Sequence, residues 1–151
     1  FNLFLENARF LSDKFGIVPL LYGSLGLEYL TRDVLSVDDI DILVPRVFIT
    51  DRWQEFKAVL EEHGYVLADE HEHTFVRDGV EYSYADIEDL ESFAGINTEA
   101  IEMHEVDGIR FLLLSLEQYV AVYKQSSKDG YRVNVRQKKD ADKIRFIESK
   151  L

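Results

Sequence analysis

The sequence has no cysteine among its 151 residues, which excludes a disulfide framework, a thiolate metal site and a cysteine nucleophile. It also has no long apolar run: stretches such as Phe111 to Leu114 are far shorter than the roughly 20 residues that span a membrane. No basic segment followed by an apolar segment opens the chain. These absences predict a soluble, cytoplasmic protein that has no membrane partner.

Positive charge is scarce in this chain. Seventeen Lys and Arg residues stand against 29 Asp and Glu residues, which gives a formal net charge of -12. Such an acidic surface disfavours a general grip on nucleic acid phosphates, so an RNA or DNA partner would need a local basic patch. We therefore expect no strong general nucleic-acid binding.

The length and composition indicate one folding unit. A chain of 151 residues with 46% hydrophobic content can bury one core but is too short for two ordinary domains. No repeat or low-complexity tract divides it. We predict a single domain over residues 1–151, in which residues 1–96 form the core and residues 97–151 supply a hairpin and the helices that close a cleft.

Hydrophobic periodicity predicts an α/β (α+β) fold, with helices packed against a short, twisted, mixed sheet. Two Asp-Gly pairs, at 78–79 and 107–108, indicate tight hairpin turns. The predicted helices cover residues 3–15, 24–30, 51–63 and 87–93 and two segments after residue 115. The predicted strands cover residues 17–22, 37–44, 65–68, 74–77, 80–85, 101–106 and 109–113.

The first candidate binding element is the pair Gly23-Ser24, which follows a predicted strand and opens a short helix. This arrangement places backbone N–H groups and a hydroxyl at the positive end of a helix, where phosphate binds readily. Gly23 also permits close approach of a ligand to the backbone. Taken alone, a Gly-Ser pair after a strand is equally compatible with an ordinary loop.

The second candidate element is the pair Asp39 and Asp41, which alternates with Ile40 and Ile42 along a predicted strand. Positions i and i+2 of a strand face the same side, so the two carboxylates share one face. They repel each other unless a cation lies between them, and Mg²⁺ (or Mn²⁺) prefers such oxygen ligands. The alternative is an edge strand whose acidic face is solvated.

Together the two elements resemble a known signature. Leu21-Tyr22-Gly23-Ser24 followed by Asp39-Ile40-Asp41-Ile42 is similar to the apolar-Gly-Ser, short helix, Asp-apolar-Asp-apolar pattern of the DNA polymerase beta-like nucleotidyltransferase superfamily. The spacing of fourteen residues between Ser24 and Asp39 lies at the long end of the usual gap. The resemblance implies a nucleoside triphosphate, ATP among the candidates, bound at Gly23 and Ser24, with catalytic metal held by Asp39 and Asp41.

The carboxy-terminal third carries a second resemblance. Residues 111–118, followed by Lys124, Arg136, Lys139 and Asp140, resemble the last helices of small bacterial nucleotidyltransferase-like proteins, which include lincosamide-type antibiotic transferases and AbiEii-type toxins. The resemblance implies that Lys124 and Asp140 face the nucleotide. Lys124 is also compatible with a surface lysine whose stem lies along apolar neighbours.

This second pattern departs from its relatives at one position. AbiEii-like proteins usually carry another Asp three residues after the first, where this chain has Lys143, and Asp142 stands one place earlier. The second acidic role therefore has no direct match in this chain.

The superfamily normally supplies a third carboxylate from a later strand, and Asp86 and Glu81 are the candidates here. Their positions differ in parity, so in a regular strand only one of them can face the site. We predict Asp86 as the third catalytic residue because it lies in an apolar-flanked Ala-Asp-Ile triplet, whereas Glu81 adjoins a hairpin turn.

These observations predict a metal-dependent nucleotidyltransferase that moves a nucleoside monophosphate to a hydroxyl or phosphate acceptor on an unidentified small molecule, protein or RNA. The alternative is a catalytically inactive nucleotide-binding or toxin–antitoxin-type protein on the same fold. An unrelated acidic interaction domain would show no metal-dependent nucleotide binding.

Overall fold

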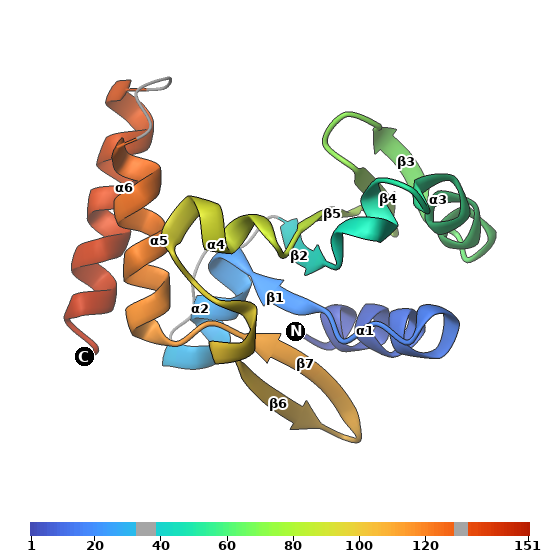
Figure 1. Cartoon of the computed structure of the whole chain (residues 1–151), viewed down its shortest axis with the longest axis horizontal. Helices are drawn as coiled ribbons and strands as arrows, with labels where there is room; N and C mark the ends of the chain where they lie inside the picture. The colour runs from blue at the N-terminus through green and yellow to red at the C-terminus, as the bar shows by residue number, and fades with distance from the viewer. Residues whose placement is uncertain (33–38, 129–132) are drawn as a thin grey trace.

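Seven strands form one mixed sheet in the computed structural model, and helices pack on both of its faces (Figure 1). The structure describes residues 1–32, 39–128 and 133–151, with the backbone alone for residues 127, 128 and 133–140. The strands are β1 (Leu20–Tyr22), β2 (Asp39–Val44), β3 (Val66–Asp69), β4 (Thr74–Arg77), β5 (Val80–Asp86), β6 (Glu102–Val106) and β7 (Ile109–Leu113). The helices are α1 (Asn2–Phe15), α2 (Gly23–Thr31), α3 (Trp53–Glu62), α4 (Asp89–Ala94), α5 (Leu116–Lys128) and α6 (Val133–Glu148), with short 3-10 turns at η1 (Arg46–Ile49) and η2 (Thr98–Ala100).

The order of the strands across the sheet is β3-β4-β5-β2-β1-β7-β6. Strand β2 therefore lies in the middle, antiparallel to β1 and parallel to β5. The two predicted Asp-Gly turns join β4 to β5 and β6 to β7, and Asp78 and Asp107 adopt φ of 52° and 53°. Positive φ at both turn residues matches the twist of a two-residue hairpin.

One face of the sheet packs against α1 and α3. The apolar stripe of α1 buries Phe4, Ala8 and Leu11, and the helix ends at Gly16, whose left-handed φ of 68° lets its N–H cap the last turn. Ile40 and Ile42 of β2 belong to the same core. The side chains of β2 therefore alternate between the two faces of the sheet, and its two isoleucines face α1.

The opposite face packs against α4, α5 and α6, which lie on the left in Figure 1. Leu20 and Leu43 of the sheet contribute to this second core, together with Tyr119 and Ile147 from the last two helices. The predicted capping box opens α5: the Gln118 N–H donates to Ser115 Oγ at 3.1 Å, and the Ser115 N–H donates to Gln118 Oε1 at 2.9 Å.

The mixed α/β fold is confirmed, and every predicted helix and strand has a counterpart among the described residues, with ends displaced by a few residues. Residues 37 and 38, the predicted start of one strand, lie outside the described residues. In the described ranges 1–32, 39–128 and 133–151, no helix is both long and apolar enough to cross a membrane.

Candidate functional site

The strand with the two aspartates lies beside the strand that ends at the Gly-Ser pair. Tyr22, the last residue of β1, pairs with Asp41 of β2, and Gly23 and Ser24 follow directly as the first turn of α2. Both aspartates are half-buried and lie on the face opposite Ile40. The fold therefore brings all four predicted residues of the two motifs to one end of neighbouring strands.

Gly23 is in direct contact with one of these carboxylates. A Cβ atom on Gly23 would lie 2.6 Å from Oδ2 of Asp41, and Gly23 has a φ of 67°. Space and backbone conformation therefore both require glycine at this position. The Gly-Ser turn and the acidic pair are therefore packed against each other.

A lysine from the carboxy-terminal helix completes this group. Lys143 of α6 donates a hydrogen bond from Nζ to Ser24 Oγ at 3.2 Å, and its ammonium lies 4.9 Å from the ring centroid of Tyr123. Lys143 occupies the position at which the sequence resemblance would place a second Asp. It places a positive charge beside the hydroxyl at the amino terminus of α2.

The pKa of Asp41 is raised from 3.8 to about 6, because burial and the negative charge of Asp39 raise it more than the positive charge of Lys143 lowers it. Desolvation of the charged form is the largest of these causes. Asp41 thus carries an uncompensated cost as an anion in the unliganded protein. A divalent cation beside it would remove that cost.

The third predicted catalytic residue, Asp86, is not brought to this group. It pairs in register with Val44 and so lies on the isoleucine side of the sheet. There its buried carboxylate accepts hydrogen bonds from Arg46 Nε and, at 2.8 Å, from the Glu88 backbone N–H. These contacts satisfy the buried carboxylate and give Asp86 a structural role in the turn that leads to α4.

The other candidate, Glu81, lies on the side of the acidic pair. Glu81 is in register with Asp39, and Ser83 is in register with Asp41, so all four share one sheet face. The side chain of Glu81 is exposed, and Ser83 Oγ lies 2.9 Å from Thr74 Oγ1. Register therefore favours Glu81 over Asp86 as the third carboxylate.

The two remaining predicted residues differ in what the structure describes. Lys124 lies on α5 with its Nζ 3.7 Å from Glu148 Oε1, and its side chain is 56% exposed. The side chain of Asp140 falls outside the described residues. Of the lysines considered in the sequence, Lys143 rather than Lys124 has a described contact with Ser24.

The donor set fits one side of a magnesium ion. Asp39 and Asp41 offer hard carboxylate oxygens, and Mg²⁺ is commonly held by one or two carboxylates while substrate phosphates and water fill its other positions. The part of the chain that the structure describes contains no group of three or more His, Asp or Glu side chains placed to hold a metal by themselves. A metal at this position would thus take its remaining ligands from a bound phosphate and water.

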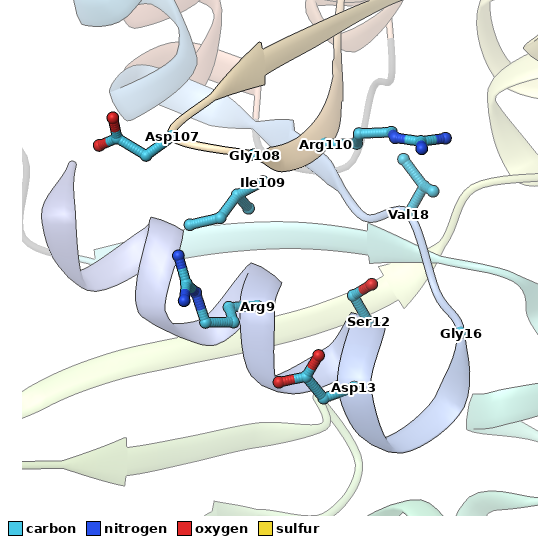
Figure 2. Close-up of a pocket in the computed structure, with 9 residues that line it drawn as sticks. All are labelled: Arg9, Ser12, Asp13, Gly16, Val18, Asp107, Gly108, Ile109 and Arg110. Carbon is cyan, nitrogen blue, oxygen red and sulfur yellow. The ribbon is translucent and has the colours of Figure 1, made fainter.

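A cavity of about 580 Å³ lies elsewhere, between α1 and the β6–β7 turn (Figure 2). Arg9 and Ser12 line it from the helix, and Ile109 and Arg110 from the hairpin. The cavity contains none of the predicted site residues, so the candidate site is defined by side-chain chemistry and not by the size of a hollow.

Comparison with known proteins gives this geometry a context. No family model matches the chain. It is 39% identical over 147 residues to the uncharacterized protein YnaI of Bacillus subtilis (strain 168), covering 97% of this chain and 94% of YnaI. The chain belongs to the YnaI family. The similarity spans both motifs and the carboxy-terminal helices, so the comparison applies to the whole site.

Comparison with solved structures shows which fold this member of the YnaI family adopts. ANT(2'')-Ia in complex with adenylyl-2''-tobramycin superposes with a TM-score of 0.60 at 13% identity, covering 98% of this chain and 87% of ANT(2'')-Ia. A nucleotidyltransferase-like protein from Paracoccidioides brasiliensis superposes with a TM-score of 0.62 at 16% identity, covering 97% and 73%. The chain has the nucleotidyltransferase fold, as its motifs predicted.

Proposed function

We propose that the protein is a metal-dependent nucleotidyltransferase that uses a nucleoside triphosphate. The observation that carries this proposal is the packing of Asp41 against Gly23, which joins an acidic pair to the positive end of α2. A triphosphate binds where hydrogen-bond donors and a divalent cation act together, and this group offers the donors and two carboxylates that could hold the cation.

The phosphates would bind at the first turn of α2. The backbone N–H groups there have no partner within the helix, and the Ser24 hydroxyl and Lys143 ammonium add two further donors. Asp39 and Asp41 would hold Mg²⁺ or Mn²⁺, which neutralises charge on the reacting phosphates and on the leaving pyrophosphate. Lys143 thereby takes the nucleotide-facing role that the family resemblance gives to Lys124.

The reaction would be an in-line displacement at the α-phosphorus. An acceptor oxygen forms a bond to this phosphorus, the bond between the α-phosphorus and the bridging oxygen breaks, and pyrophosphate leaves. The acceptor's proton needs a base, and Glu81 is our candidate because it shares the sheet face of the acidic pair. Because ANT(2'')-Ia is seen with an adenylyl aminoglycoside, ATP and a hydroxyl acceptor are the first pair to test.

One observation favours a second candidate, a nucleotide-binding protein without turnover. Within the described ranges no third acidic side chain is placed with the pair to hold a metal, and Glu81 is exposed. Such a protein would bind triphosphate and metal but release no pyrophosphate. The two functions therefore differ in one measurable product.

A screen of ATP, GTP, CTP and UTP with Mg²⁺ or Mn²⁺ tests both candidates. Calorimetry measures binding, and a coupled assay measures pyrophosphate release with and without small hydroxyl acceptors. Metal-dependent binding with release supports transfer, and binding without release supports the second candidate. Absence of binding to every triphosphate, or binding that Asp41→Asn leaves unchanged, would refute both.

A further inference from the structure

A buried tyrosine contacts the phosphate-binding turn from the side of α5. Tyr119 is fully buried, and its hydroxyl donates a hydrogen bond to the backbone carbonyl of Gly23 at 3.0 Å. A Cβ atom on Gly26 would lie 2.0 Å from this hydroxyl, so the ring reaches the turn because residue 26 has no side chain. Gly26 thus makes room for Tyr119, as Gly23 makes room for Asp41.

The carbonyl that Tyr119 holds is chemically joined to the donor that a phosphate would use. The Gly23 C=O and the Ser24 N–H belong to the same planar, trans peptide unit, in which they point in opposite directions. When the Gly23 carbonyl points toward Tyr119, the Ser24 N–H therefore points away from Tyr119. That N–H belongs to the first turn of α2, where N–H groups lack helical partners.

This peptide opens α2, and the Gly23 carbonyl belongs to the first turn of that helix. Gly23 nevertheless has a left-handed φ of 67°, which lies outside the helical range, so the start of α2 departs from regular helix geometry at this residue. The hydrogen bond from Tyr119 gives the Gly23 carbonyl a second donor from the side of α5 and so restrains its direction at this irregular start.

We propose that Tyr119 is a positioning residue, which aims the Ser24 N–H at the phosphate of a bound triphosphate. The inference deepens the proposed function and rests on it. Burial raises the pKa of Tyr119 well above 10, so the hydroxyl stays protonated and remains a donor at neutral pH. Tyr119 would act through the peptide and would not touch the nucleotide.

The test compares Tyr119→Phe with Tyr84→Phe, both made in the full chain. Tyr84 is also fully buried, and its hydroxyl accepts a hydrogen bond from Asn7 Nδ2 at 2.7 Å, but it lies in the core on the other face of the sheet. Residual dipolar couplings of backbone amides report the direction of each N–H bond without any ligand. Calorimetry with Mg²⁺ and ATP then measures binding to the same proteins.

In Tyr119→Phe we expect the residual dipolar coupling of the Ser24 amide to change, while the couplings of the β4 and β5 amides stay at wild-type values. In Tyr84→Phe we expect the coupling of the Ser24 amide to stay at its wild-type value. Binding of ATP with Mg²⁺ should weaken about fivefold to tenfold in Tyr119→Phe, the effect of losing one well-aligned hydrogen bond. It should change less than twofold in Tyr84→Phe.

An unchanged Ser24 coupling in Tyr119→Phe would overturn the inference, as would a changed coupling with unchanged ATP affinity. A changed coupling in a protein whose wild type binds no triphosphate would refute the proposed function and leave the orienting role of Tyr119 intact. If Tyr119→Phe does not fold, Gly26→Ala allows the same measurement, since its methyl group would displace the hydroxyl.

Discussion

Asp41 occupies the space that a side chain on Gly23 would need, with its Oδ2 atom 2.6 Å from the Cβ position. Gly16 is a matched control because its φ of 68° is nearly the same as the 67° of Gly23, and a Cβ there meets nothing within 4 Å. Gly16→Ala should cost about 1–2 kcal/mol from the left-handed backbone. Gly23→Ala should cost about 1–3 kcal/mol more from the clash.

Urea denaturation measures the two losses in free energy of unfolding. The Gly23→Ala protein should also lose metal-dependent ATP binding, because its Asp41 is pushed out of place. Equal losses in the two variants would show that the contact between Asp41 and Gly23 is loose.

A second prediction concerns the charge of Asp41. Because the folded-state pKa is raised from 3.8 to about 6, the native protein binds a proton that the unfolded chain has already lost between these values. The contribution of Asp41 to stability should therefore fall as pH rises from 4 to 6 and stay level above 6. Asp41→Asn removes this loss, so the variant should be more stable than wild type at pH 7, by about 1–3 kcal/mol, and equal to it near pH 4.

Thermal melts across pH check this, with the exposed Asp51→Asn as the charge-matched control. In the presence of Mg²⁺ and ATP the order should reverse, because ligand binding stabilises the native state of wild type alone. A variant less stable than wild type at pH 7 without ligand would show that Asp41 is held as an anion by the fold.

The third prediction separates two lysines. Lys143→Met should weaken ATP binding about tenfold or more, the effect of losing a charged hydrogen-bond donor at the phosphates. Lys124→Met, which removes an exposed pair with Glu148, should change the affinity less than twofold. Calorimetry measures both affinities. The reverse order would return the nucleotide-facing role to Lys124.

The fourth prediction separates two acids. Asp86→Asn removes the buried carboxylate that Arg46 Nε contacts, while Arg46 keeps its contact with Asp89, and should lower the free energy of unfolding by about 1–3 kcal/mol, with ATP binding and pyrophosphate release unchanged. Glu81→Gln should leave stability near wild type and reduce pyrophosphate release at least tenfold, because a base is lost. A catalytic defect in Asp86→Asn alone would contradict the strand register.

The elements and the central acidic pair were predictable because local chemistry determines them. Asp39 and Asp41 share a face by the two-residue period of a strand, and that property needs no knowledge of neighbouring strands. The Asp78-Gly79 turn likewise follows from the backbone preferences of two residues. Such features depend on a few adjacent residues.

The third carboxylate and the lysine depend on tertiary structure. The odd and even sequence positions of Glu81 and Asp86 showed that the two side chains face opposite sides of their strand. Only the pairing of β5 with β2 shows which of them lies on the face of the acidic pair. Burial of Asp86, which its apolar neighbours indicated, arises from its pairing with Arg46. Lys143 looked like a departure from a family pattern, and its contact with Ser24 arises from the packing of α6.

The two contacts made by the last helices also have a consequence for synthesis of the chain. Gly23 and its partner Tyr119 are 96 residues apart, and Ser24 and Lys143 are 119 residues apart. Both aspartates therefore leave the ribosome long before the groups that orient and neutralise the site. A nascent chain that stops before α5 has the acidic pair alone, with neither the tyrosine nor the lysine, so under the proposed function we expect such a chain to bind no nucleotide.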